Sequence, residues 1–286
     1  MKIIELNYKQ YNNIIFCGDV HGLLNLKSVL IDYIKDISDT LIIILGDIGV
    51  GFSSPVIEKN IIKDCNEILK KSNNQLILFR GNHDNPYYFY ENSEYNQDNV
   101  KLIRDYTILN TKNNNILCIG GGISIDRTNR LLNRTYWLNE NILPLTDNLM
   151  NDIINLNYNI DIIATHNAPL FIPPINKSID EEGYMVESWS FYDKELKKDV
   201  WNDRYVLNNL YEFIIKYHNI KYWFYGHFHN MYKTIYNDIT FIGLDMYYKH
   251  IKTVKYSLEK SIVKYGPDLY NLYDENKFTN LKEIKN

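Results

Sequence analysis

The chain has 286 residues, of which 45% are hydrophobic and 23% are charged, proportions typical of a globular protein with ample apolar material for a core. Its formal net charge is −4 at pH 7. This charge argues against a protein held to nucleic acid by phosphate neutralisation, because such proteins normally carry a clustered basic face.

Apolar strands and helical patterns alternate in the first part of the chain. We expect strands at 13–22, 40–49 and 75–84, separated by helices at 23–36 and 56–71. This β-α-β-α-β order predicts a parallel sheet covered by helices. In such sheets the functional groups gather beyond the carboxyl ends of the strands.

The rest of the chain predicts a second sheet with more antiparallel pairing. Segments 100–110 and 114–125 flank a short polar turn and suit a hairpin, as do 231–236 and 239–248. Between these hairpins the sequence predicts, in chain order, a strand at 161–169, a helix at 203–218 and a strand at 221–229.

We expect a single domain over residues 1–286. The mixed polar and aromatic segment 170–202 contains two adjacent prolines and is long enough to form a lid or insert over a site. Residues 251–286 are expected to be a C-terminal extension of the domain.

Five of the predicted strands end on residues of metal-ligand type, in most cases directly after a glycine. These strand ends are GDVHG (18–22), GDIG (46–49), GNHD (81–84), THNAP (165–169) and GHFH (226–229). Glycine in these positions would let the backbone turn sharply and approach a ligand closely. One such motif is more often a plain turn, but five of them, holding five of the seven histidines, indicate a metal centre.

The GHFH motif raises a question of direction. If the strand continues to its last residue, His227 and His229 point to the same side while Phe228 points away. Two imidazoles would then face one place at the strand end.

The order GDxHG, GDx, GNH(D/E), a lone His and GHxH resembles the signature of the calcineurin-like metallophosphoesterase superfamily, from about Ile14 to Phe241. The resemblance implies an α/β (α+β) fold, a four-layer αββα sandwich of two mixed sheets flanked by helices, with a dinuclear metal site at the strand ends. It also implies that Asp47 bridges the two ions and that His83 lies just outside them. The remaining implied ligands are Asp19, His21 and His229 for one ion, and Asn82, His166 and His227 for the other.

This ligand set has a chemical rationale. Carboxylate oxygen and imidazole nitrogen suit Mn, Fe, Zn or Co better than Ca. We expect two divalent or trivalent ions, Mn first, with Fe, Zn, Co or Mg as alternatives. Two such ions about 3.5–4 Å apart would share a water and lower its pKa, so that a bridging hydroxide attacks phosphorus in line.

Two neighbouring residues have candidate catalytic roles. A protonated His83 could donate to the leaving oxygen as a general acid. Asp84 could orient an imidazole, or it could only form a turn or cap before Pro86.

One departure from the resemblance separates this chain from the Ser/Thr protein phosphatases. Those proteins continue the second motif as GDxxDRG, whereas this chain has GDIGVGF, with Val50 in place of the acid. The sequence therefore leaves open which residue supports His83.

Residues 120–140, GGGISIDRTNRLLNRTYWLNE, resemble a GGxxSxDxxxR segment of small uncharacterised superfamily members, followed by a tryptophan and an acid. Arg127, Arg130 and Arg134 have helical spacing and would share one face. Arg127 or Arg130 could bind a substrate phosphate with both arms of its guanidinium. The alternative is that these arginines pair with acids at the surface.

We therefore expect a metal-dependent phosphoesterase acting on a mono- or diester, with a small phosphate ester or a nucleotide as substrate. The alternatives are a catalytically silent scaffold of the same fold, which would normally lack some of the ligands, and a small nuclease, which the charge disfavours. The oligomeric state stays open.

The sequence also favours a soluble, cytoplasmic protein with no membrane partner. The cysteines form neither a disulfide framework nor a metal knuckle, which favours a reducing compartment. No stretch approaches 18 apolar residues, and the first residues lack the apolar region of a signal peptide.

Overall fold

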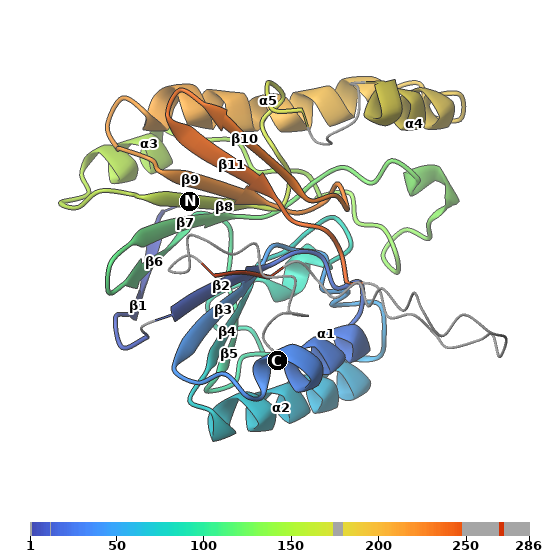
Figure 1. Ribbon diagram of the computed structural model, residues 1–286. Helices are drawn as coiled ribbons and strands as arrows, with labels where there is room; N and C mark the ends of the chain where they lie inside the picture. Colours follow the sequence, from blue (N-terminus) through green and yellow to red (C-terminus); the bar gives the residue numbers. More distant parts are fainter. Residues whose placement is uncertain (1, 12, 174–179, 248–268, 272–286) are drawn as a thin grey trace, which may run out of the picture.

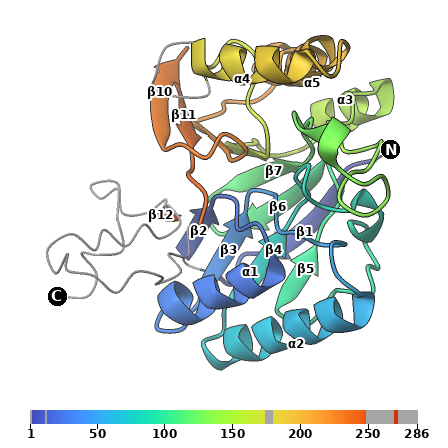
Figure 2. The same cartoon turned by 90° about the vertical axis from the view of Figure 1, so that its right-hand side faces the viewer.

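Two β-sheets pack face to face, and helices cover the outer face of each (Figure 1; Figure 2). The structure is a computed structural model that describes residues 2–11, 13–173, 180–247 and 269–271. The expected four-layer αββα sandwich is confirmed.

The smaller sheet contains the three strands that the first part of the sequence predicts. Its order is β12-β2-β3-β4-β5, and all neighbours are parallel except β12 and β2. The strands are β2 (Asn13–Cys17), β3 (Thr40–Ile44), β4 (Gln75–Leu78), β5 (Val100–Leu102) and β12 (Leu269–Asn271). Its outer face is covered by α1 (Leu23–Val29), which continues as a π-helical turn (Leu30–Ile34), and by α2 (Pro55–Lys71).

The larger sheet has the order β1-β6-β7-β8-β9-β11-β10. The expected hairpins are present as the antiparallel pairs β6–β7 and β10–β11, and the other neighbours are parallel. Its strands are β1 (Ile4–Tyr8), β6 (Thr107–Thr111), β7 (Asn115–Ile119), β8 (Ile162–Thr165), β9 (Tyr222–Tyr225), β10 (Tyr232–Tyr236) and β11 (Ile239–Gly243). Its helices are α3 (Asp147–Ile154) and α5 (Leu196–Ile214), with α4 (Asp180–Ser190) beside the first half of α5.

Strands β2, β3 and β4 of the smaller sheet are apolar after their first residue, because both of their faces are buried. Along β2, Ile14 and Phe16 join the core between the sheets, while Ile15 and Cys17 join the core beneath α1 and α2. The rings of Phe16 and Phe224 stack across the two sheets, with centroids 4.0 Å apart. This double burial fixes the register of each strand and therefore the place where it ends.

The structure differs from the expected elements in three places. Segment 100–110 is divided between β5 of the smaller sheet and β6 of the larger one, so the chain changes sheets after Leu102. The helix expected at 203–218 begins at Leu196 and ends at Ile214. Strand β1 has no counterpart among the expected elements.

The roles expected for two segments are not tested. Much of the expected insert at 170–202 is helical, in α4 and the start of α5, and 174–179 lie outside the described residues. The expected extension at 251–286 also lies outside them, apart from β12. In the described part of the chain, every helix is too short or too polar to cross a membrane.

Candidate metal centre

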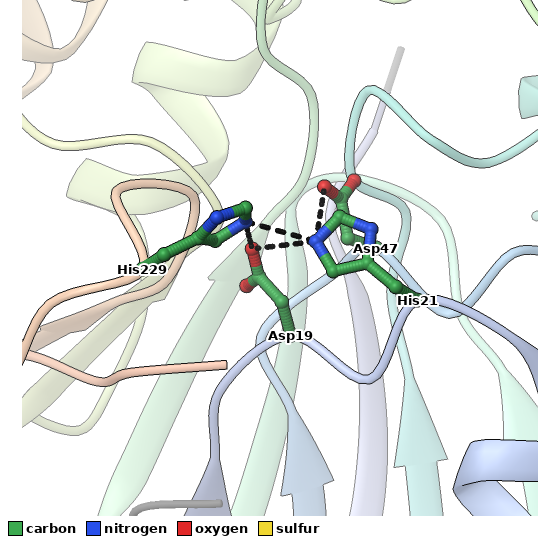
Figure 3. A group of neighbouring side chains, drawn as sticks. All are labelled: Asp19, His21, Asp47 and His229. Atoms are coloured by element: carbon green, nitrogen blue, oxygen red, sulfur yellow. Dashed lines mark hydrogen bonds and ion pairs between the residues drawn. The ribbon is translucent and has the colours of Figure 1, made fainter. Parts of the chain in front are cut away.

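The loops after β2, β3, β8 and β9 bring two groups of ligand-type side chains together. The first group is Asp19, His21, Asp47 and His229, whose donor atoms lie within 4.8 Å of one another (Figure 3). The second group is Asp47, His166 and His227, within the same distance. Asp47 is common to both groups.

Donor atoms of the first group face one another instead of forming separate pairs. Nε2 of His21 lies 2.9 Å from Nε2 of His229 and 3.8 Å from Oδ2 of Asp47 (Figure 3). Nε2 of His229 also lies 3.1 Å from Oδ2 of Asp19. The two carboxylates are buried, so a cation between these nitrogen and oxygen donors would relieve their mutual repulsion.

His166 is fixed as a nitrogen donor in the second group. Its Nδ1 lies 2.6 Å from the carbonyl oxygen of Leu45, which can only accept, so Nδ1 carries the proton. In the neutral ring, Nε2 then directs a lone pair at Oδ1 of Asn82, 3.0 Å away. Two acceptors this close need a proton or a cation between them, which is the arrangement expected of two ligands of one metal.

The electrostatics of the site favour the ligand forms of Asp47 and His227, whereas at His166 and His229 the neighbouring carboxylates outweigh burial and raise the pKa of the imidazole. Burial opposes ionisation of Asp47, but the imidazoles of His166, His83 and His21 hold its pKa well below the usual range. Burial and the neighbouring His166 lower the pKa of His227 to about 3, which keeps this imidazole neutral. A carboxylate and a neutral imidazole are the states that bind a metal ion. The mixed oxygen and nitrogen donors therefore fit transition-metal ions.

Four of the converging residues have left-handed backbone. The φ angles are 45° at His21, 51° at Asp47, 70° at His227 and 48° at His229. Non-glycine residues adopt this region infrequently, and such strain gathers at functional sites.

This backbone corrects the strand alternation expected for the GHFH motif. Strand β9 ends at Tyr225, so strand geometry does not direct the two histidines that follow. Instead, His229 joins the first group and His227 joins the second.

Glycines precede the ligands mainly because the strand ends approach one another closely. A Cβ atom at Gly81 would lie 2.1 Å from Oδ1 of Asp47, and one at Gly226 would lie 2.3 Å from Oδ1 of Asp19. At Gly46 it would lie 2.4 Å from Nδ1 of His166. Of these three glycines, only Gly46 has positive φ, so the expected sharp turn applies there alone.

His83 lies at the rim of the two groups. Its Nε2 is 4.0 Å from Oδ2 of Asp47, and its ring meets the edge of the His21 ring. The guanidinium of Arg130 contacts both ring nitrogens, at 3.2 Å and 2.6 Å. Burial lowers the pKa of His83 to about 4, and the charge of Arg130 acts in the same direction. An arginine therefore stands beside His83, while Val50 is buried in the core.

Asp84 holds the loop that carries Asp47. Its carboxylate accepts hydrogen bonds from the backbone N–H groups of Ile48, Gly49, Val50 and Gly81, at 2.8 to 3.1 Å. The expected cap before Pro86 is formed by Asn85 instead. Its side-chain oxygen accepts from the backbone N–H of Tyr87, at the start of the 3₁₀ turn Pro86–Tyr88. Asp84 thus ties the loop after β3 to the loop after β4.

The two candidate phosphate-binding arginines have different surroundings. The expected common helical face is not formed, because only Arg127–Asn129 makes a 3₁₀ turn and Arg130 has extended backbone. Arg127 donates to Asp193, just before α5, and to Asp199, in the first turn of α5. Arg130 donates to Asp126 and lies against His83. Only Arg130 therefore touches the catalytic candidate.

Two further residues orient the Asn82 amide. Its Nδ2 donates to Oγ of Ser124 at 3.0 Å, and this hydroxyl donates to Oε2 of Glu140 at 2.7 Å. Glu140 also accepts from the backbone N–H of Ser124. This chain of hydrogen bonds turns the Asn82 oxygen toward His166. The sequence pattern of metal-ligand residues gives no signal for Ser124 and Glu140, although both lie in the Gly-rich segment 120–140.

We predict that Ser124→Ala weakens metal binding in the second group. Without the Ser124 hydroxyl, the Asn82 amide loses its partner and can rotate, which typically costs about 10- to 100-fold in affinity. Titration with Mn²⁺ or Zn²⁺ in a calorimeter would measure this loss. The first group provides an internal control, and equal weakening of both binding events would contradict the prediction.

We also predict that Gly81→Ala disrupts metal binding, because the new methyl group would displace the Asp47 carboxylate. Gly122→Ala is the matched control, since a Cβ there has ordinary contacts of 3.4 Å or more with Asn82 and His166. The same titration, with circular dichroism to verify folding, should show binding lost in the first variant and kept in the second. Normal binding by Gly81→Ala would show that the close approach is not required.

A comparison with known families agrees with the motifs of this site. A family model described as calcineurin-like phosphoesterase matches residues 13–231, more than half of the chain. No curated protein sequence matches significantly. One solved structure, a phosphopantetheinyl hydrolase from Mycobacterium tuberculosis, matches with 13% identity over 82% of this chain and 89% of that chain, with a TM-score of 0.36. A likeness this distant says nothing about the substrate of the present chain. The family match shows that the chain belongs to the calcineurin-like phosphoesterases, a family of metal-dependent phosphoester hydrolases.

Proposed function

We propose that the chain hydrolyses a phosphate mono- or diester with two metal ions held by the first and second groups, the second completed by Asn82. The observation that carries this proposal is the shared position of Asp47, whose carboxylate lies within reach of the donors of both groups. When bound, two such ions supply a water of lowered pKa and positive charge for the phosphoryl oxygens. Manganese is the expected metal, with Fe, Zn, Co or Mg as alternatives.

The chain's own residues divide the remaining tasks. Asp84 positions the Asp47 loop through backbone hydrogen bonds. His83, one quarter exposed at the rim, is proposed to give a proton to the leaving oxygen. Because burial and Arg130 lower its pKa, this role requires the negative charge of the bound phosphoryl group to favour the protonated ring. Arg130 is the better candidate for holding a phosphoryl oxygen, because its guanidinium lies beside His83, whereas Arg127 already donates to two carboxylates.

A silent scaffold and a small nuclease receive no specific support. The side chains of both groups lie close together and Asn82 lies against His166, an arrangement that a scaffold would not need. The net charge of −4 does not favour a nucleic-acid substrate. The proposed substrate is therefore a small phosphate ester or a nucleotide, handled by a protein with no membrane partner.

We predict that the purified protein with Mn²⁺ hydrolyses 4-nitrophenyl phosphate or bis(4-nitrophenyl) phosphate. The Asp47→Ala variant should reduce this activity to background and leave at most one ion per chain, because both groups lose their common ligand. Release of 4-nitrophenol and metal analysis after dialysis would measure the two effects.

Asp64→Ala is the control, since this acid lies on the surface and contacts only Lys27 among the ion pairs of the described residues. It should retain the activity and both ions. If Asp47→Ala hydrolysed these esters within tenfold of the parent protein, the shared-ligand assignment would be wrong.

A further inference from the structure

A cavity of about 380 Å³ opens directly beside the metal centre. His21 and His83 form the end of the cavity that borders the centre. The rest of the wall is largely apolar and comes from α1, the loop after β3 and α2, with the side chains of Leu23, Leu24, Phe52, Ile57 and Ile61.

The larger polar side chains of this wall, those of Glu58 and Asn25, already make hydrogen bonds within the protein. The carboxylate of Glu58 accepts from the backbone N–H groups of Gly51 and Ser53 and from the hydroxyl of Tyr95. The amide of Asn25 donates to the carbonyl oxygens of Val20 and His21. No lysine or arginine is among the described residues of the lining. A charged group entering the cavity would therefore lose water without gaining a counter-charge.

Several apolar side chains of the wall are exposed. Leu24 is 68% exposed and Ile57 is 55% exposed. The ring of Phe52 lies nearly parallel to that of His83, with centroids 6.2 Å apart, and meets Trp137 edge-on. Apolar groups gathered in a hollow next to polar chemistry are typical of a ligand site.

His83 separates two environments. The Arg130 guanidinium contacts its ring nitrogens, whereas Phe52 and the apolar cavity lie along its ring. A phosphate ester bound here would place its anionic phosphoryl group between the ligand side chains and Arg130. Its alcohol portion would then extend past His83 into the cavity.

We infer that the cavity binds the alcohol portion of the substrate, and that this portion is an uncharged aryl or alkyl group instead of an anionic one. This inference rests on the proposed function. In the reaction, one water is consumed, the P–O bond to the alcohol breaks, and a new P–O bond forms to the water oxygen. The released alcohol takes a proton and leaves through the apolar cavity.

The test compares phenyl, 4-ethylphenyl and 4-butylphenyl phosphates, as monoesters and as methyl diesters. Their leaving phenols have nearly the same acidity, so differences in rate report on binding of the alkyl chain. We expect kcat/KM to rise by about two- to fourfold for each added methylene, the upper value corresponding to complete burial.

Ile57→Asp should abolish this dependence on chain length. Val56→Asp is the matched control, because Val56 is 70% exposed on the same turn of α2 but is not part of the wall. Both substitutions add a carboxylate near the start of the helix, so their effects on the helix dipole are alike.

Binding of 4-butylphenol, followed by NMR, separates this inference from the proposed function. We expect binding to the parent protein and to Val56→Asp, and a dissociation constant at least tenfold higher for Ile57→Asp. If no ester is hydrolysed but the phenol binds in this pattern, the proposed function fails and the apolar site stands. If esters are hydrolysed without dependence on chain length, or the phenol does not bind, the inference is overturned.

Discussion

The structure around the site depends on one constraint, which is that Asp19 and Asp47 must stay ionised while buried close together. A buried carboxylate is costly unless positive charge or hydrogen-bond donors surround it. Here the imidazoles of both groups and the backbone supply them: the N–H of His83 donates to Asp47, and the N–H of His227 donates to Asp19. Each buried acid is thus held by the backbone of a different strand end.

The same constraint explains why the supporting residues are far from one another in the sequence. Asp84 fixes the backbone that carries Asp47, and Glu140 fixes Ser124 and through it Asn82. Arg80 connects the second of these supports to the crossing between the sheets, since it pairs with buried Asp105 and donates to the backbone carbonyl of Glu140. Asp105 lies where the chain passes from the smaller sheet to the larger one. The crossing between the sheets and the orientation of a ligand are therefore parts of one hydrogen-bonded unit.

The sequence predicts the layers and the converging motifs because both have local signals. Buried parallel strands are continuous apolar runs, and glycine next to ligand residues marks their ends. The sheet crossing lacked such a signal, because segment 100–110 has strand-like residues on both sides of Asp105. The start of α5 was missed because its first turns are rich in charge, although Leu196 and Val200 are buried four residues apart. Arginine spacing suggested a helix where the chain makes only a short turn.

The surroundings of His83 could not be predicted, because they depend on which residues three separate loops bring together. Val50 stands where the second motif of the Ser/Thr protein phosphatases has an acid. Its side chain packs in the core, and its backbone N–H donates to Asp84. The acid beside the His83 ring is Asp47, 4.0 Å from Nε2, whose charge raises the pKa of His83, while Arg130 lies closer to the ring and lowers it. A cation at this place disfavours a protonated imidazole but attracts a phosphate. With Phe52 on the other side, the same histidine marks the boundary between an anion-binding and an apolar half of the site.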